Sequence, residues 1–275
     1  MLDKNIRQRI IALIQREVVP AVGCTEPIAV ALCTARATET LGCRPEKITA
    51  LLSANILKNA MGVGIPGTGM IGLPIAIALG AIVGKSEYEL EVIKDVTPET
   101  LEEGKKYVDE KRIDIKLKAD ITEKLYIDVI CEAAGHKAEA VIAGSHTNFV
   151  YVSKDGETLL DVKKTSGEDG EQGDPELCMR TVYDFATTTP LNEIAFILKT
   201  KQYNIKAAEE SIKGNYGHCL GKTIDRPLSH GIFGNSIFSH ILSKTASACD
   251  ARMGGAMIPV TVSYTHLRAH ETDQY

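Results

Sequence analysis

Cys24 is the residue whose type and position in this 275-residue chain point most directly to chemistry. It precedes Thr25-Glu26-Pro27, where Thr25 can cap a helix N-terminus and Pro27 suits the first turn of that helix. A cysteine there faces unpaired N–H groups and the positive end of the helix dipole, which favour the thiolate that attacks substrates or binds metals. The sequence therefore predicts a thiolate at Cys24. The alternative interpretation is a buried structural cysteine that precedes a helix.

A second candidate is the glycine-rich segment at residues 59–69. Gly62, Gly64 and Gly67 match the G-x-G-x-x-G fingerprint of dinucleotide-binding proteins, and Glu87 stands at the distance of a ribose-binding acid. The match is weak, because Lys58 and Asn59 occupy the expected strand end and no βαβ pattern follows. A glycine loop before a helix can instead hold a small carboxylate on its backbone N–H groups, or simply let two helices pack closely.

Two further polar groups complete the candidates. Residues 144–148 lie between two predicted strands and offer a run of hydrogen-bonding side chains, typical of a site or of a tight polar turn. Arg252 ends a predicted helix, where it could bind a carboxylate or only complement the helix dipole. The histidines of the C-terminal third, His218, His230 and His240, are twelve and ten residues apart, which does not match a zinc site.

Composition narrows the possible functions. The chain has 31 Lys+Arg and 36 Asp+Glu, a net charge of −5, with 5% aromatic residues and no Trp, which disfavours binding to nucleic acid. Seven cysteines without a C-x-x-C pair or a signal peptide indicate the reducing cytoplasm. The longest apolar run, residues 70–83, is shorter than the ~20 residues of a membrane span, so we expect a buried helix there and no membrane partner.

The periodicity of apolar residues predicts an α+β fold. Helices are expected at 3–19, 27–41, 97–110, 176–187, 190–199, 204–213 and 235–248. Strands are expected at 88–93, 113–117, 125–130, 137–142 and 149–152, the last followed by an Asp155-Gly156 turn, whereas segment 48–56 fits either a strand or a helix.

These elements suggest a helical catalytic domain with an inserted antiparallel β-meander. We expect helical halves at 1–86 and 175–260 to pack together on either side of a meander at 87–165. Residues 261–275 resemble a translated adapter sequence, so they are set aside as a loose tail. The natural protein is then expected to continue beyond Val260, and this chain to be a fragment of it.

Four motifs together resemble the L-cysteine desulfidases, a family related to the α chain of iron–sulfur L-serine dehydratases. They are Gly23-Cys24-Thr25-Glu26-Pro27, the segment from Asn59 to Thr68, His146-Thr147-Asn148, and Asp250-Ala251-Arg252-Met253-Gly254-Gly255, and the resemblance runs from about residue 5 to 260. It implies a [4Fe–4S] cluster held by three cysteines, with Cys24 as the first ligand and one iron open to substrate. The other two ligands of the family follow a Ser-Gly-Ser-Gly-Asn-Gln-Gly segment that this chain lacks.

The resemblance implies β-elimination of L-cysteine to pyruvate, ammonia and sulfide. We expect Cys24, the glycine-rich segment and the 146–148 turn to share one cleft, with catalytic roles for Thr25, Glu26 and His146. The predicted substrate-binding residues are Asn59, Met61, Gly62, Gly64, Thr68, Ser145, Thr147, Asn148 and Arg252. The alternatives are an L-serine ammonia-lyase, a dinucleotide-dependent enzyme and a non-catalytic ligand-binding fragment. A homodimer is plausible in each case.

Overall fold

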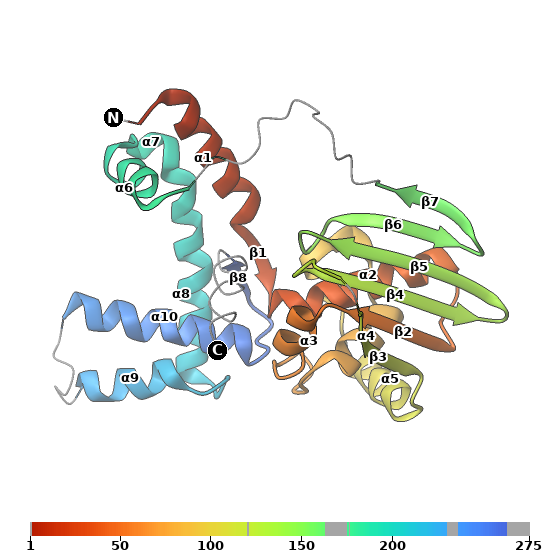
Figure 1. Cartoon of the computed structure of the whole chain (residues 1–275). Coiled ribbons are helices and arrows are strands. Elements are labelled where there is room, and N and C mark those ends of the chain that lie inside the picture. Colours follow the sequence, from red (N-terminus) through yellow and green to blue (C-terminus); the bar gives the residue numbers. More distant parts are fainter. Residues whose placement is uncertain (1, 120, 163–174, 176, 230–235, 263–275) are drawn as a thin grey trace.

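The computed structural model describes residues 2–119, 121–162, 175, 177–229 and 236–262 (Figure 1). The fold is α+β, as predicted. A six-stranded sheet with helices α2–α5 forms one part, which we call the sheet part. Helices α1 and α6–α10, with the two-stranded pair β1–β8, form a second group, which we call the helical part.

The sheet has the strand order β3-β2-β4-β5-β6-β7. Strands β4, β5 and β6 form an antiparallel meander, as predicted, and β7, which was not expected, extends it through a hairpin that turns at Asp155-Gly156. Strand β2 extends the sheet beyond β4, and β3 pairs with it in parallel rather than joining the meander. The strand bounds are Lys47–Leu52 (β2), Ile113–Leu117 (β3), Tyr126–Ala133 (β4), His136–Ala143 (β5), Phe149–Lys154 (β6) and Glu157–Asp161 (β7).

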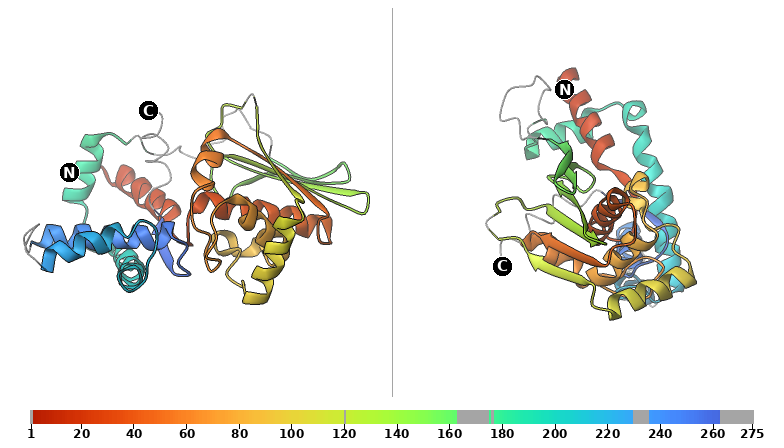
Figure 2. Two further views of the ribbon diagram at one scale, coloured as in Figure 1. Left: turned by 90° about the horizontal axis from the view of Figure 1, so that it is seen from below. Right: turned by 90° about the vertical axis from the view of Figure 1, so that its right-hand side faces the viewer.

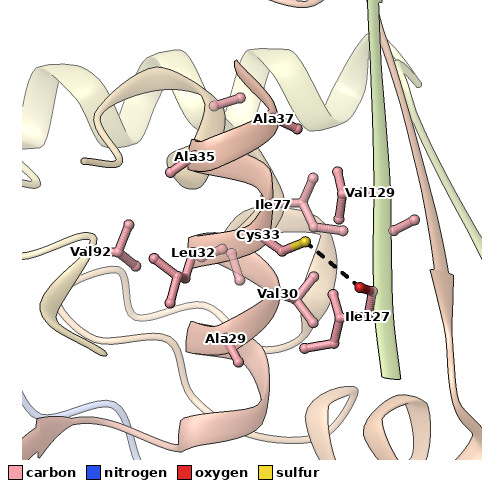
Figure 3. Close-up of a cluster of buried hydrophobic side chains, with 14 of the residues drawn as sticks. Ala29, Val30, Leu32, Cys33, Ala35, Ala37, Ile77, Val92, Ile127 and Val129 are labelled. Carbon is pink, nitrogen blue, oxygen red and sulfur yellow. Dashed lines mark hydrogen bonds between the residues drawn. The ribbon is translucent and has the colours of Figure 1, made fainter. Parts of the chain in front are cut away.

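Helix α2 (Thr25–Leu41) packs along β4 and β5 and forms the centre of the main core. Its residues are small or aliphatic on nearly every face as far as Ala35, so that stretch is buried almost all round, whereas Arg36 and Glu39 near its end are exposed. Gly42 ends the helix with a φ of 85°. Figure 3 shows Cys33 of this helix among aliphatic side chains, with its thiol directed at Ile127 of β4. The same thiol lies 3.1 Å from the carbonyl oxygen of Ala140, which makes Cys33 a core residue, as predicted.

Three shorter helices complete the sheet part: α3 (Ala54–Ala60), α4 (Leu73–Ile82) and α5 (Pro98–Asp109). Helix α4 is the predicted buried apolar helix, and it lies between α2 and α5. Gly80 permits this packing, because a Cβ there would lie 2.5 Å from the carbonyl oxygen of Ala31 in α2. Within the described ranges, no helix is both long and apolar enough to cross a membrane.

The helical part joins the two ends of the described chain. Helix α1 (Lys4–Glu17) meets the C-terminal helices through a cluster of Ile10, Ile11 and Phe185, and Arg7 forms an ion pair with Glu193 at 3.0 Å. Strand β1 pairs with β8 in antiparallel fashion. The remaining bounds are Val19–Val22 (β1), Met179–Thr188 (α6), Leu191–Ile194 (α7), Ala195–Ile197 (η2), Leu198–Lys213 (α8), Leu220–Ser229 (α9), Ile237–Met253 (α10) and Pro259–Val262 (β8).

The packing groups the elements differently from the expected segments 1–86, 87–165 and 175–260. Of the first segment, α1 and β1 join the C-terminal helices, whereas α2, β2, α3 and α4 pack in the sheet part (Figure 2). Thr261 and Val262, expected to open a loose tail, instead pair with Pro20 and Val19 in the β1–β8 ribbon. Residues 263–275 lie outside the described residues.

Two local predictions are resolved or corrected, and one helix is new. The strand expected at 88–93 is wrong: Ser86–Glu91 is a 3-10 helix, η1, in which Glu89 has a φ of 48°. The ambiguous segment 48–56 divides at Ser53, where β2 ends and a side-chain cap starts α3. Helix α9 was not expected at all.

Candidate functional site

Cys24 occupies the N-terminus of α2, as predicted. It is the N-cap itself, with φ −76° and ψ 134°, and Thr25 is the first helical residue, so the expected capping role of Thr25 is wrong. Gly23 precedes it with a φ of 77°, a conformation that glycine adopts readily. The turn at Gly23 carries the chain from β1 into α2, and Arg252 of α10 contacts Gly23 and Thr25 on either side of Cys24, so Cys24 lies where the two parts of the molecule meet.

The Cys24 thiol is protonated and buried. Only 5% of the residue is exposed, and Sγ donates a hydrogen bond to Oε2 of Glu26 at 2.9 Å. Burial, together with the negative charge of Glu26, raises the pKa of this thiol to about 12, although the positive charge of Arg252 acts in the opposite direction. The predictions of a favoured thiolate and of a sulfur facing an opening are therefore wrong for the folded chain, because desolvation outweighs the helix dipole.

Glu26 is the charged partner of this thiol. Its Oε2 accepts hydrogen bonds from Cys24 and, at 3.2 Å, from Oγ1 of Thr25. Burial acts to raise the pKa of Glu26, but the hydrogen bond from Cys24 and the nearby charges of His146 and Arg252 lower it below its ordinary value. Glu26 is therefore an ionised carboxylate at neutral pH, and His146 lies close enough to act on it electrostatically.

Arg252 reaches this pair from the C-terminal end of α10. Its Nε donates to the carbonyl oxygen of Gly23 at 3.3 Å, and one Nη donates to Oγ1 of Thr25 at 3.4 Å. More than 220 residues separate the two ends of each contact, so only the tertiary fold creates the arrangement. The guanidinium thus adds positive charge beside the half-buried Glu26 carboxylate at the junction of the two parts.

The glycine loop, which we define as residues 62–69, packs against the same junction. The amide of Gly64 donates to the carbonyl of Met253 at 2.9 Å, and that of Gly67 donates to the carbonyl of Gly255 at 3.2 Å. A Cβ on Gly23 would lie 2.4 Å from Cγ of Pro66, so the loop also touches the residue before Cys24. The loop therefore joins the Cys24 turn to the end of α10.

The surroundings of this loop do not match a dinucleotide-binding site. A strand, β2, does lie before Gly62 and has one parallel neighbour, but α3 separates it from the glycines. The following helix, α4, begins after Gly72, outside the G-x-G-x-x-G motif. The fingerprint requires a strand, a glycine turn and a helix in direct succession, so this context supports a packing loop rather than a pyrophosphate cradle.

Two other predicted site residues form hydrogen bonds within their own loops. Thr68 donates to the carbonyl of Ile65 at 2.7 Å and accepts from the amide of Met70, and the side chain of Asn148 donates to the carbonyl of Ala143 at 2.9 Å. The remaining candidates are exposed or half-buried: Asn59, Met61, Gly62, Ser145 and Thr147. Substrate contacts by any of these residues stay predictions.

Sequence reasoning missed the role of the residues that hold the site together. Gly23, Pro66, Met253 and Gly255 lie within the motifs named above, but their contacts, which join the three segments, depend on the fold and were not predicted. In the described residues, no group of three His, Cys, Asp or Glu side chains is arranged to hold a metal ion. Cys24 is therefore a single candidate ligand within this part of the chain.

The chain is similar to curated proteins that carry the name UPF0597 protein. It is 68% identical over 259 residues to the one from Bacteroides fragilis and 64% identical over 254 residues to the one from Bacteroides thetaiotaomicron. A more distant relative, from Oleidesulfovibrio alaskensis, is 41% identical over 256 residues. These matches cover 94%, 92% and 92% of this chain but 60%, 59% and 59% of the relatives, so the chain spans about three-fifths of their length. No family model and no solved structure matches it.

Proposed function

We propose that this chain carries part of the active site of a [4Fe–4S]-dependent lyase that converts L-cysteine to pyruvate, ammonia and sulfide. The observation that carries the proposal is the partly buried contact between Sγ of Cys24 and Oε2 of Glu26 at 2.9 Å, with Arg252 beside it. Two distant segments meet there, close to His146. The resemblance to L-cysteine desulfidases rests on the same residues, which supports the assignment.

Of the three cysteine ligands that such a cluster needs, this chain supplies one, Cys24. Metal binding requires a thiolate, and the ionised Glu26 is in hydrogen-bond contact with the proton that Cys24 must lose. We assign the other two ligands to the part of the longer relatives that this chain does not match. When bound, the cluster would supply an open iron that acts as a Lewis acid toward the leaving sulfur.

The chain's own residues would bind the substrate and move its proton. Arg252 presents a planar guanidinium suited to the substrate carboxylate, although in the free chain it holds Gly23 and Thr25. Elimination transfers the α-proton to a base while the β-substituent leaves, and the resulting aminoacrylate hydrolyses to pyruvate and ammonia. Glu26 is our candidate for that base, because its lowered pKa keeps it ionised at neutral pH, with His146 as the neighbouring second candidate.

The test uses this chain extended by the unmatched segment of the Bacteroides fragilis relative and reconstituted with iron and sulfide under anaerobic conditions. Bound iron, brown absorbance, and release of sulfide from L-cysteine and of ammonia from L-serine are measured. We expect Cys24→Ser to lose the cluster and both reactions. Cys33→Ser is the matched control, because Cys33 lies in the same helix and a serine there can still donate to the carbonyl of Ala140.

The outcomes separate the alternatives. Faster turnover of L-serine than of L-cysteine would assign the same site to an L-serine ammonia-lyase. A bound cluster without turnover of either amino acid would favour a ligand-binding role. Wild-type cluster content and activity in Cys24→Ser would show that Cys24 is structural and that the proposal is wrong.

A further inference from the structure

The first two turns of α10 carry their apolar side chains on the outside. Ile237, Phe238, Ile241 and Leu242 are 81%, 73%, 57% and 45% exposed. We call these four residues the α10 face. A surface helix of a globular protein normally turns such residues toward the core.

The side of α10 that is buried is rich in serine instead. Ser239, Ser243 and Ser247 are at most 7% exposed and lie where α10 packs against α8 and α9. The hydroxyl of Ser243 contacts the carbonyl of Gly221 at 3.3 Å and the carboxylate of Asp225 at 3.1 Å. These contacts fix which side of α10 points inward, so the outward position of the α10 face follows from them.

The whole helical part is short of buried apolar residues. Of the nineteen large hydrophobic residues that are exposed in the described chain, thirteen lie between residues 177 and 257. The buried clusters of the helical part contain four and three residues, whereas the cluster of the sheet part contains thirty-five. Exposed apolar residues in such density mark a surface that another element covers.

We propose that the α10 face is the docking surface for an apolar segment in the part of the longer relatives that this chain does not match. That part amounts to about two-fifths of their length, and no region of this chain corresponds to it. The proposal does not depend on a metal cluster or on catalysis.

The size of the α10 face favours a segment of the same polypeptide over a second copy. Two helical turns extend about 11 Å, too little by themselves for the ~800 Å² that each partner buries in a stable complex. A covalently linked segment needs less area, because its effective concentration is high. The face also lies on the helix whose other end carries Arg252, so a segment docked along α10 would extend toward the candidate site.

The test compares Phe238→Asp in two proteins: this chain, and this chain extended by the unmatched segment of the Bacteroides fragilis relative. In the chain alone, the change should leave the melting temperature within about 1 °C, because Phe238 is 73% exposed. In the extended protein, it should lower the melting temperature by about 5–10 °C, since a charge would replace a buried ring. Leu159→Asp on β7, 57% exposed and in the sheet part, should be neutral in both.

Hydrogen exchange provides a second readout that does not depend on the variants folding. Amides of residues 237–244 should exchange at least about tenfold more slowly in the extended protein than in the chain alone. Unchanged exchange together with a neutral Phe238→Asp would overturn the proposal. A concentration-dependent dimer of the chain alone that Phe238→Asp dissociates would also overturn it, and would assign the α10 face to a second copy.

Discussion

At the Cys24 thiol, burial and the Glu26 carboxylate act in the same direction. Both favour the protonated thiol, and the thiol in turn helps to keep Glu26 ionised by donating a hydrogen bond to it. The Cys24 thiol and the Glu26 carboxylate therefore share one proton, which keeps the thiol in its unreactive protonated form. Its behaviour in the free chain can be measured without any cofactor.

The first prediction concerns the alkylation of Cys24. Because burial raises the pKa of its thiol to about 12, the thiolate fraction at pH 8 is small and rises about tenfold per pH unit until that value. Mass-spectrometric mapping with iodoacetamide at pH 8 should show Cys24 reacting at least about 100-fold more slowly than Cys43, which is exposed. Glu26→Gln should speed the reaction, because it removes a charge that raises the pKa. Equal rates at Cys24 and Cys43 would contradict this account.

A second prediction concerns the buried carboxylate of Asp128 on β4. Its Oδ2 accepts from Lys118 at 2.8 Å, its side chain is 3% exposed, and its Oδ1 has no hydrogen-bond partner in the described structure. Lys118→Met should cost about 1–3 kcal/mol of unfolding free energy in urea, because it leaves the buried carboxylate without a hydrogen-bond donor. Lys116→Met, which removes the exposed pair with Asp114, should cost about 0–1 kcal/mol. Equal effects of the two changes would count against the argument.

At the scale of elements, sequence patterns predicted the helices and strands that depend on neighbouring residues. Helix α2 was predictable because an apolar run follows a cap-like Thr-Glu-Pro and ends at Gly42. The segment 88–93 was predicted wrongly, because its apolar residues are buried by a 3-10 helix that contains Leu90 and by the turn after it, which contains Val92 and Ile93. The parallel β2–β3 pair joins residues more than sixty apart, which no window of sequence can indicate.

The same distinction applies to the candidate site. The position of Cys24 at a helix start depends on its neighbours in sequence and was predicted correctly. The pKa of its thiol depends on burial and on Glu26 in its own helix, but also on Arg252, which the fold brings in from elsewhere. The helix dipole alone therefore predicted the wrong protonation state.

A third prediction tests how the glycine loop packs on α10. A Cβ on Gly64 would lie 2.6 Å from the carbonyl carbon of Gly254, whereas one on Gly62 would have no atom within 4 Å. Gly64→Ala should destabilise the chain by about 1–3 kcal/mol in urea, because backbone must move to make room. Gly62→Ala, in the same loop, should change stability by less than about 0.5 kcal/mol. A neutral Gly64→Ala would mean that the loop does not pack this closely in solution.

At the scale of the molecule, one part is well packed and the other is not. The sheet part holds the large core around α2, α4 and β4, whereas the helices of the C-terminal region bury few apolar residues. The two parts are not consecutive in sequence, since the first helix of the helical part comes from the start of the chain and its other helices come from the end.

The fourth prediction is a gradient of hydrogen exchange across the two parts. Amides of β4 and β5 should be the slowest in this chain, because they are paired on both sides beneath α2. Amides of α6 and α7 should be at least about 100-fold faster, because of these helices only Phe185 is buried. Uniform protection throughout the chain would contradict the contrast in packing.

The junction of the two parts packs glycine against glycine, because a Cβ on Gly64 would meet the backbone of Gly254 and a Cβ on Gly255 would meet the backbone of Gly64 and Ile65. Every missense change that a single base can make in a glycine codon adds at least a Cβ. No single-base substitution at Gly64 is therefore conservative, whereas other positions of the chain can change to residues of similar size and polarity. In a library of all single-nucleotide variants, few or no substitutions at Gly64, Gly254 and Gly255 should be found among the variants that fold. Compensation would require a second change across the interface.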